Sequence, residues 1–156
     1  MNITDIKSSN ILTIEKLKAY ANIVGCEHDD ELRSILRSAA IRVAQYADVA
    51  LLGCTIVDDV YGGGEIQLWM PPVADDVTVK DMASGDDVTE RCTRMGDRMI
   101  LPETGNYTVT YSVEPTDATV EQYAPLVWQM AVAMWDGNTD EEQKVYRRIP
   151  AGYVVH

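Results

Sequence analysis

The amino-acid sequence predicts an α+β fold: two N-terminal helices, a small antiparallel strand block, one C-terminal helix and an extended tail. Apolar residues repeat at helical spacing up to about residue 52, and the period changes to two over residues 55–113. Helical spacing then returns over residues 120–137. We expect a single domain over residues 1–156, because this length suits one hydrophobic core.

The first helix is expected over residues 13–25. Its apolar residues follow one another at intervals of three or four: Ile14, Leu17, Ala21 and Val24. Thr13 can cap the start by accepting a backbone N–H bond, and Gly25 can end the helix in the left-handed conformation.

The second helix is expected over residues 29–52, with Asp29 as its cap. Its apolar stripe consists of Leu32, Ile35, Leu36, Ala39, Val43, Tyr46, Ala47 and Ala50. The opposite face is less uniformly charged than that of a solvated helix and contains Arg33, Arg37, Ile41, Ala44, Asp48 and Leu51. Either these are scattered surface residues, as in most proteins, or another subunit packs there.

The strand block is expected over residues 55–113. Alternating patterns predict strands at residues 65–70, 77–79 and 107–111. Turn-forming residues punctuate them at 62–64, 71–72, 84–86, 96–97 and 104–106. Acidic pairs are also expected at caps and turns, where aspartate bonds to the backbone: Asp29-Asp30, Asp58-Asp59, Asp75-Asp76 and Asp86-Asp87.

The last helix is expected over residues 120–137. Its main part should start at Pro125, since proline is best tolerated in the first helical turn, and should end near Gly137. A cluster at helical spacing is expected in the core or at a subunit contact: Trp128, Met130, Met134 and Trp135. Residues 138–144 are expected to form a loop and residues 145–156 an amphipathic tail.

The composition restricts the functions that the chain can have. It carries 13 Lys and Arg against 25 Asp and Glu, and the net charge of -12 disfavours binding to nucleic acid by release of counterions. No apolar run reaches the length of a membrane span, and no signal peptide is recognisable, so we expect neither membrane insertion nor secretion. Three widely spaced cysteines suggest no disulfide framework and a reducing cytoplasm.

No pattern indicates catalysis, a cofactor or a metal. The chain has only two histidines, His28 and His156, so a histidine-based general base is not expected. Cys26, His28, Cys54 and Cys92 could supply four zinc ligands, but they lack the paired spacing of zinc ribbons. The glycines at residues 62–64 precede Glu65 and a strand, whereas a phosphate cradle needs a basic residue and a helix, so we expect a flexible loop.

The order of elements resembles the head-tail connector (adaptor) proteins of long-tailed bacteriophages. Residues 12–51, "LTIEKLKAYANIVGCEHDDELRSILRSAAIRVAQYADVAL", look like the family's two helices around an acidic loop. "EIQLWMPPVADDVTVKD" (65–81) and "GNYTVTYSVEP" (105–115) are similar to its strands, and "APLVWQMAVAMWDGN" (124–138) to its terminal helix. In the family this helix usually ends in aromatic-x-Asn-Arg, and here Thr139 stands in place of the arginine.

The resemblance implies a structural subunit, not an enzyme. Roughly a dozen copies would form a ring that joins the portal to a stopper or tail-completion protein while DNA passes through without sequence-specific binding. The ring would be assembled in the bacterial host cytoplasm and become the connector of the virion. The candidate interface residues are Arg33, Arg37, Ile41 and Ala44 on the second helix, Trp135, and the apolar tail residues Tyr153, Val154 and Val155.

Two other classes of function stay open at this point. The chain could be another capsid- or tail-completion protein, or a generic α+β interaction module, which a gene neighbourhood beside portal and capsid genes would separate from a connector. A small enzyme is the third class. Concentration-dependent ring formation would separate it from the connector.

Overall fold

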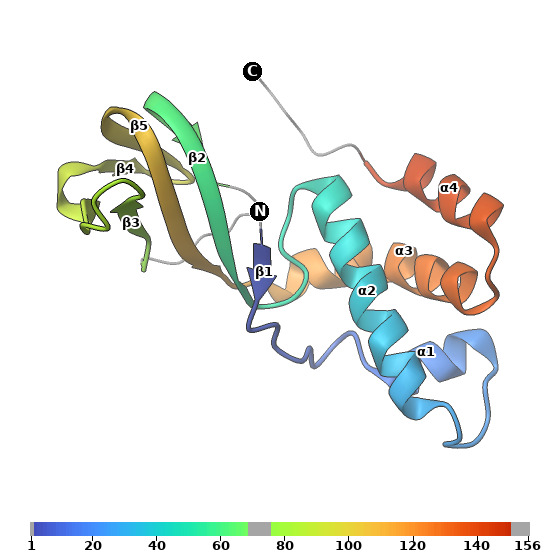
Figure 1. Ribbon diagram of the computed structural model, residues 1–156. Coiled ribbons are helices and arrows are strands. Elements are labelled where there is room, and N and C mark those ends of the chain that lie inside the picture. Colours follow the sequence, from blue (N-terminus) through green and yellow to red (C-terminus); the bar gives the residue numbers. More distant parts are fainter. Residues whose placement is uncertain (1, 69–75, 151–156) are drawn as a thin grey trace. The chain divides into compact units, whose positions relative to one another are not determined.

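The computed structural model describes residues 2–68 and 76–150 (Figure 1). The chain forms four helices and a five-stranded antiparallel sheet within these residues, so the predicted α+β class is confirmed. It divides into two compact units, which we call the sheet unit (Met1–Lys7 and Gly53–Glu114) and the helical unit (Ser8–Leu52 and Pro115–His156). The expected single domain stays a prediction. Among the described helices, none has the length and apolar character needed to cross a bilayer.

The sheet unit is built around two long antiparallel strands. The strand order is β1-β2-β5-β3, and β4 pairs with another part of β5. The strands are β1 (Asn2–Thr4), β2 (Cys54–Gln67), β3 (Thr78–Asp81), β4 (Thr93–Met95) and β5 (Arg98–Val113), with a short 3-10 helix, η1 (Thr89–Arg91). The N-terminal strand was not predicted, because three residues are too few to show an alternating pattern.

The turns predicted at residues 62–64 and 104–106 are wrong, because β2 and β5 run through both positions. Gly62 pairs with Gly105, and after a shift in register Gly64 pairs with Leu101. A Cβ atom on Gly63 would lie 2.8 Å from Oγ1 and 3.0 Å from the backbone nitrogen of Thr104. The glycines therefore let two strands approach closely around a bulge, instead of forming a flexible loop.

The other turn and strand predictions fit the structure better. Gly85 (φ +76°) and Gly96 (φ +64°) take left-handed conformations in the predicted turns. The strand predicted at 77–79 corresponds to β3, and part of 65–70 lies in β2; residues 69–72 lie outside the described residues. Asp58 and Asp59 were expected in a turn, but they lie within β2, where Asp59 accepts a cross-strand hydrogen bond from Thr108.

Helix α1 (Ile14–Ala21) begins as predicted and ends earlier. The Thr13 side chain accepts a 3.4 Å hydrogen bond from the backbone N–H of Lys16. The helix ends at Asn22, which adopts the left-handed conformation (φ +56°) that was expected of Gly25. Asparagine tolerates this conformation better than most residues, so the chain has already left the helix when it reaches the exposed Val24.

Helix α2 (Asp29–Ala47) begins as predicted, but Asp29 is its first residue and not its cap. Its carboxylate instead accepts a 2.8 Å hydrogen bond from Lys18 of α1. The helix ends before Asp48, which is left-handed, and so does not extend to residue 52. The buried residues of α2 are Leu32, Leu36, Ala39, Ala40, Val43, Ala44 and Ala47. Tyr46, placed in the core stripe by its spacing, is 47% exposed.

Helix α3 (Asp117–Trp135) starts earlier than predicted, with Thr116 as its cap. The Thr116 hydroxyl accepts a hydrogen bond from the backbone N–H of Thr119. Pro125 consequently lies inside the helix, and the placement of the helix start at this proline is wrong. The lost hydrogen bond is tolerable because Glu121, whose carbonyl would accept it, is exposed to solvent, while Val120 and Ala124 are buried and hold the first turns in place.

A fourth helix, α4 (Thr139–Arg148), replaces the loop and the start of the tail predicted for residues 138–156. Asn138 caps it by accepting a 3.1 Å hydrogen bond from the backbone N–H of Glu141. Acidic residues occupy its first turn and two arginines its last, which suits the helix dipole. Within the helical unit, α3 packs against both α2 and α4 (Figure 1).

Candidate functional site

The outer face of α2 carries three of the predicted interface residues. Arg33 and Arg37 are exposed, and Ile41 is half-buried. Arg33 lies 3.0 Å from the carboxylate of Asp30, whereas Arg37 has no hydrogen-bond or ion-pair partner among the described residues. This face therefore offers an unpaired guanidinium beside a partly exposed apolar side chain, a combination that suits a protein contact.

The placement of Ala44 on this open face is wrong. Its side chain is 1% exposed and lies in the buried stripe of α2. The stripe includes four alanines, Ala39, Ala40, Ala44 and Ala47, whose small side chains allow close approach of a packed helix. Ala44 is thus a core residue of the helical unit.

Trp135 is half-buried at the end of α3. Its ring packs edge-on against His28, with 5.3 Å between the centroids. The neighbouring aromatic position, Trp128, is also half-buried, while Met130 is fully buried in the core. Trp135 therefore has both an internal contact and a partly exposed surface. The tail candidates Tyr153, Val154 and Val155 lie outside the described residues.

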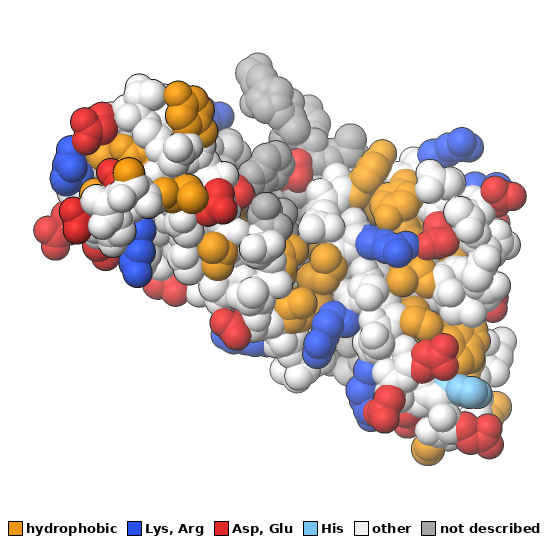
Figure 2. Space-filling model, in the orientation of Figure 1, with side chains coloured by type: hydrophobic (Ala, Val, Ile, Leu, Met, Phe, Trp, Pro, Cys, Tyr) orange, Lys and Arg blue, Asp and Glu red, His pale blue; other side chains and the backbone are white. Residues whose placement is uncertain are grey.

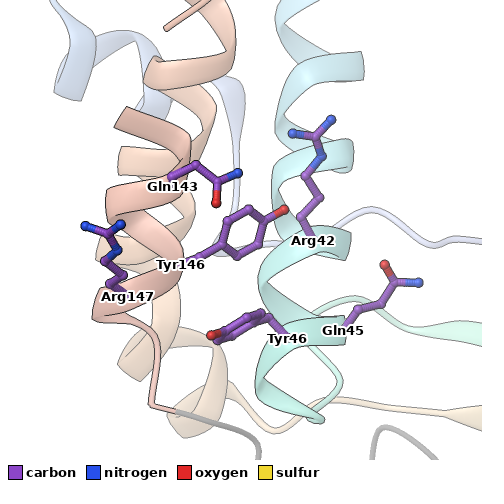
Figure 3. Close-up of a pocket in the computed structure, with 6 residues that line it drawn as sticks. All are labelled: Arg42, Gln45, Tyr46, Gln143, Tyr146 and Arg147. Carbon is purple, nitrogen blue, oxygen red and sulfur yellow. The ribbon is translucent and has the colours of Figure 1, made fainter. Parts of the chain in front are cut away.

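A groove between α2 and α4 was not predicted from the sequence. It has a volume of about 510 Å³ and is lined by Arg42, Gln45, Tyr46, Gln143, Tyr146 and Arg147. Figure 3 shows the two tyrosine rings between the helices; their centroids are 5.2 Å apart. Arg42 pairs with Glu142 of α4, which links the two helices beside the groove. The helix α4 could have been predicted from the amphipathic pattern of residues 139–148, although Val145 is the only buried residue of the helix.

The sheet unit exposes several large apolar side chains. Tyr61 is 76% exposed on β2, Met82 is 52% exposed in the loop after β3, and Met95 is 49% exposed on β4. Figure 2 shows hydrophobic and charged side chains intermixed on the face that it presents. Isolated exposed apolar residues are common, so only those supported by a second feature can be argued as contacts.

Charge is distributed unevenly along the chain. The sheet unit contains 5 Lys and Arg and 13 Asp and Glu, a net charge of -8, whereas the helical unit contains 8 and 12, a net charge of -4. In the helical unit Arg37, on α2, and Arg147, on the rim of the groove, are exposed arginines without partners among the described residues. The units thus differ electrostatically as well as in fold.

The described residues hold no cluster of side chains suited to a metal ion. No group of three or more Cys, His, Asp or Glu side chains within residues 2–68 and 76–150 is arranged to hold a metal ion. Burial raises the pKa of the Cys54 and Cys92 thiols, so these thiols are poorly suited to act as nucleophiles. Cys26 is exposed. What the surface offers is contact chemistry: arginines, tyrosines and partly exposed apolar groups.

The fold is shared with protein chains of a phage-like particle. A chain from the neck of an empty gene transfer agent particle, computed with C6 symmetry, superimposes with a TM-score of 0.63 at 16% identity. A chain from the virion of the native gene transfer agent particle gives a TM-score of 0.63 at 17% identity. Each match covers 99% of this chain and 98% of the other. The sequence matches no protein-family model, and no curated protein matches it.

Proposed function

We propose that this protein is a subunit of the head-tail connector ring of a phage or phage-like particle. The observation that carries the proposal is the similarity of fold to a chain of a particle neck, which covers 99% of this chain and 98% of the other. A fold alone does not define a function. The order of the sequence elements, which resembles that of the connector family, supports the same function.

A ring supplies a physical reason for the outer face of α2. Closed rings need a heterologous interface, in which one patch of a subunit meets a different patch of the next. Arg33, Arg37 and Ile41 form one such patch, because an exposed face with two arginines and a half-buried isoleucine gains from being covered. Trp135 contributes through its exposed part. Residues 153–155 dock against a neighbouring subunit or against the stopper protein.

The proposed number of copies is roughly a dozen. A ring of roughly a dozen subunits, as the sequence resemblance implies, is compatible with the C6 symmetry of the neck of the gene transfer agent particle. The portal and a stopper or tail-completion protein are the proposed partners on the two sides of the ring. The role is structural, and catalysis plays no part in it.

The strong negative charge suits a channel for DNA. With a net charge of -12 per chain, a ring of these subunits repels the phosphate backbone instead of binding it by counterion release. DNA that must pass rapidly in either direction benefits from a wall to which it does not adhere. We propose that acidic side chains line this passage.

Ring formation tests the proposal directly. The purified protein should form closed rings in negative-stain electron microscopy and a discrete high-mass species in mass photometry, either alone or after addition of the cognate portal protein. Association should increase with protein concentration, as for any reversible assembly. A chain that stays monomeric and fails to bind portal or stopper under all these conditions is not a connector subunit.

A further inference from the structure

We infer that the loop Asp81–Asp87 of one subunit binds in the groove between α2 and α4 of the next. This inference rests on the proposed ring and names a second pair of surfaces that would form it. The two features are complementary in chemistry and charge: a tight acidic loop with one exposed methionine, and a groove lined by tyrosines and arginines. The two features are different patches of the chain, as a heterologous contact requires, and they belong to different units.

Several polar side chains that line the groove have no partner among the described residues. Arg147 is exposed and has no partner among the described residues, and the same holds for the amides of Gln45 and Gln143. Between them, Tyr46 is 47% exposed and stacks at a tilt on Tyr146. Tyrosine and arginine are the residues that most often dominate binding energy at protein interfaces, since they combine apolar area with directed hydrogen bonds.

The loop is held in one conformation by its own hydrogen bonds. The backbone N–H of Gly85 donates to the carbonyl of Asp81 over 2.8 Å, and that of Asp81 donates to the carbonyl of Asp86 over 2.9 Å. The N–H of Met82 donates to the carbonyl of Asn106 on β5, which ties the loop to the sheet. Gly85 supplies the left-handed residue that the turn needs. A preorganised loop loses little conformational entropy on binding.

The chemistry of the loop matches that of the groove. Met82 is 52% exposed, and a methionine sulfur packs favourably against aromatic rings such as those of Tyr46 and Tyr146. Asp86 is exposed and its side chain has no partner among the described residues, so its carboxylate is free to pair with Arg147. Asp87 is different, because it already accepts two hydrogen bonds from Thr89.

The charge of the two units favours this pairing over a contact between two sheet units. The loop belongs to the sheet unit, with its net charge of -8, and the groove lies in the helical unit, with -4 and an unpaired arginine. Two sheet units brought together would repel each other more strongly than a sheet unit and a helical unit. Because the loop and the groove are different patches of the chain, their contact would order the subunits head to tail.

Photo-cross-linking locates the contact. A Met82→p-benzoylphenylalanine variant, with the same substitution at Met95 as control, is irradiated as a mixture of ¹⁵N-labelled and unlabelled protein, and cross-linked peptides are identified by mass spectrometry. Met95 is similarly exposed (49% against 52%) and lies in the same unit. The Met82 probe should link mixed-isotope peptides to residues 42–46 or 143–147, and the Met95 probe should not. Links within one copy, links to other segments or no link at the highest soluble concentration would each overturn the inference.

A charge exchange tests the pair itself. Arg147→Asp and Asp86→Arg should each reduce the association constant at least about tenfold, and the double variant should recover most of the loss. Lys16→Asp, which changes an exposed and unpaired cation on α1 in the same way, should associate like wild type. Both changed sites are exposed, so circular dichroism and melting should be unaltered. Rings that form normally from both single variants refute the loop-and-groove contact and leave the connector proposal intact, whereas wild-type protein that forms no ring and binds no portal refutes the connector proposal.

Discussion

Ile41→Asp separates folding from assembly on the outer face of α2. Complete burial of an isoleucine side chain stabilises a protein by about 1.5–3 kcal/mol relative to exposure. Ile41 is half-buried, so its replacement should cost the isolated chain roughly 1–2 kcal/mol, more than a fully exposed site would. At about 2–4 °C per kcal/mol for a chain of this size, the melting temperature should fall by roughly 2–8 °C. The variant should remain folded.

Assembly should be affected far more than folding. In a subunit contact the new carboxylate would be desolvated without a partner, which costs much more than its partial exposure in the monomer. Circular dichroism at a monomeric concentration and mass photometry at an assembling concentration measure the two effects separately. Val24→Asp is the control: Val24 is 96% exposed in the loop between α1 and α2, and its replacement should alter neither measurement. An unfolded Ile41→Asp variant would place Ile41 in the monomer core, and normal assembly would place the contact elsewhere.

The remaining predictions test single features. Gly63→Ala should lower the free energy of unfolding by about 1–3 kcal/mol in urea titrations, because its Cβ would meet the backbone of Thr104 at 3.0 Å. The hydrogen bond from Lys18 holds the pKa of Asp29 below its usual range, so this pair stabilises the fold at neutral pH and loses its effect as the pH falls through that lowered pKa. Asp29→Asn should therefore reduce stability at neutral pH and weaken its decline in acid, as seen in melting curves against pH. Duplex DNA should not bind at physiological salt in fluorescence anisotropy, since the net charge opposes it; micromolar affinity with a steep salt dependence would reverse this conclusion. Addition of EDTA should leave the melting temperature unchanged, and a fall of several degrees with stoichiometric zinc in the purified protein would contradict it.

Local signals predicted the parts of the fold that depend on nearby residues. Thr13 marks the start of α1 because a threonine cap acts within three residues, and the acidic cluster at Asp29 marks the start of α2 for a similar reason. Alternation over residues 107–111 identifies β5 because one face of the sheet is buried. These features need no knowledge of what packs against them.

The features that were missed depend on distant partners. Gly62–64 looks like a turn in isolation, and becomes part of β2 because the strand around Thr104 pairs with it closely. Residues 139–148 have mostly polar side chains, and form a helix because an asparagine cap and the burial of Val145 and Ile149 stabilise it. Neither partner can be identified from the segment alone.

The error in the facing of α2 shows why interface residues are harder to predict than helices. Spacing alone placed the large Tyr46 in the core and the small Ala44 outside, yet the structure places them the other way round. In an alanine-rich helix the buried stripe can rotate by one position without changing the number of apolar residues that it contains, so the packing partner decides the choice. Here the buried stripe with Ala44 belongs to the core shared with α3, and Tyr46 lines the groove beside α4. The side of α2 with Arg37 and Ile41 then stays available for a neighbouring subunit.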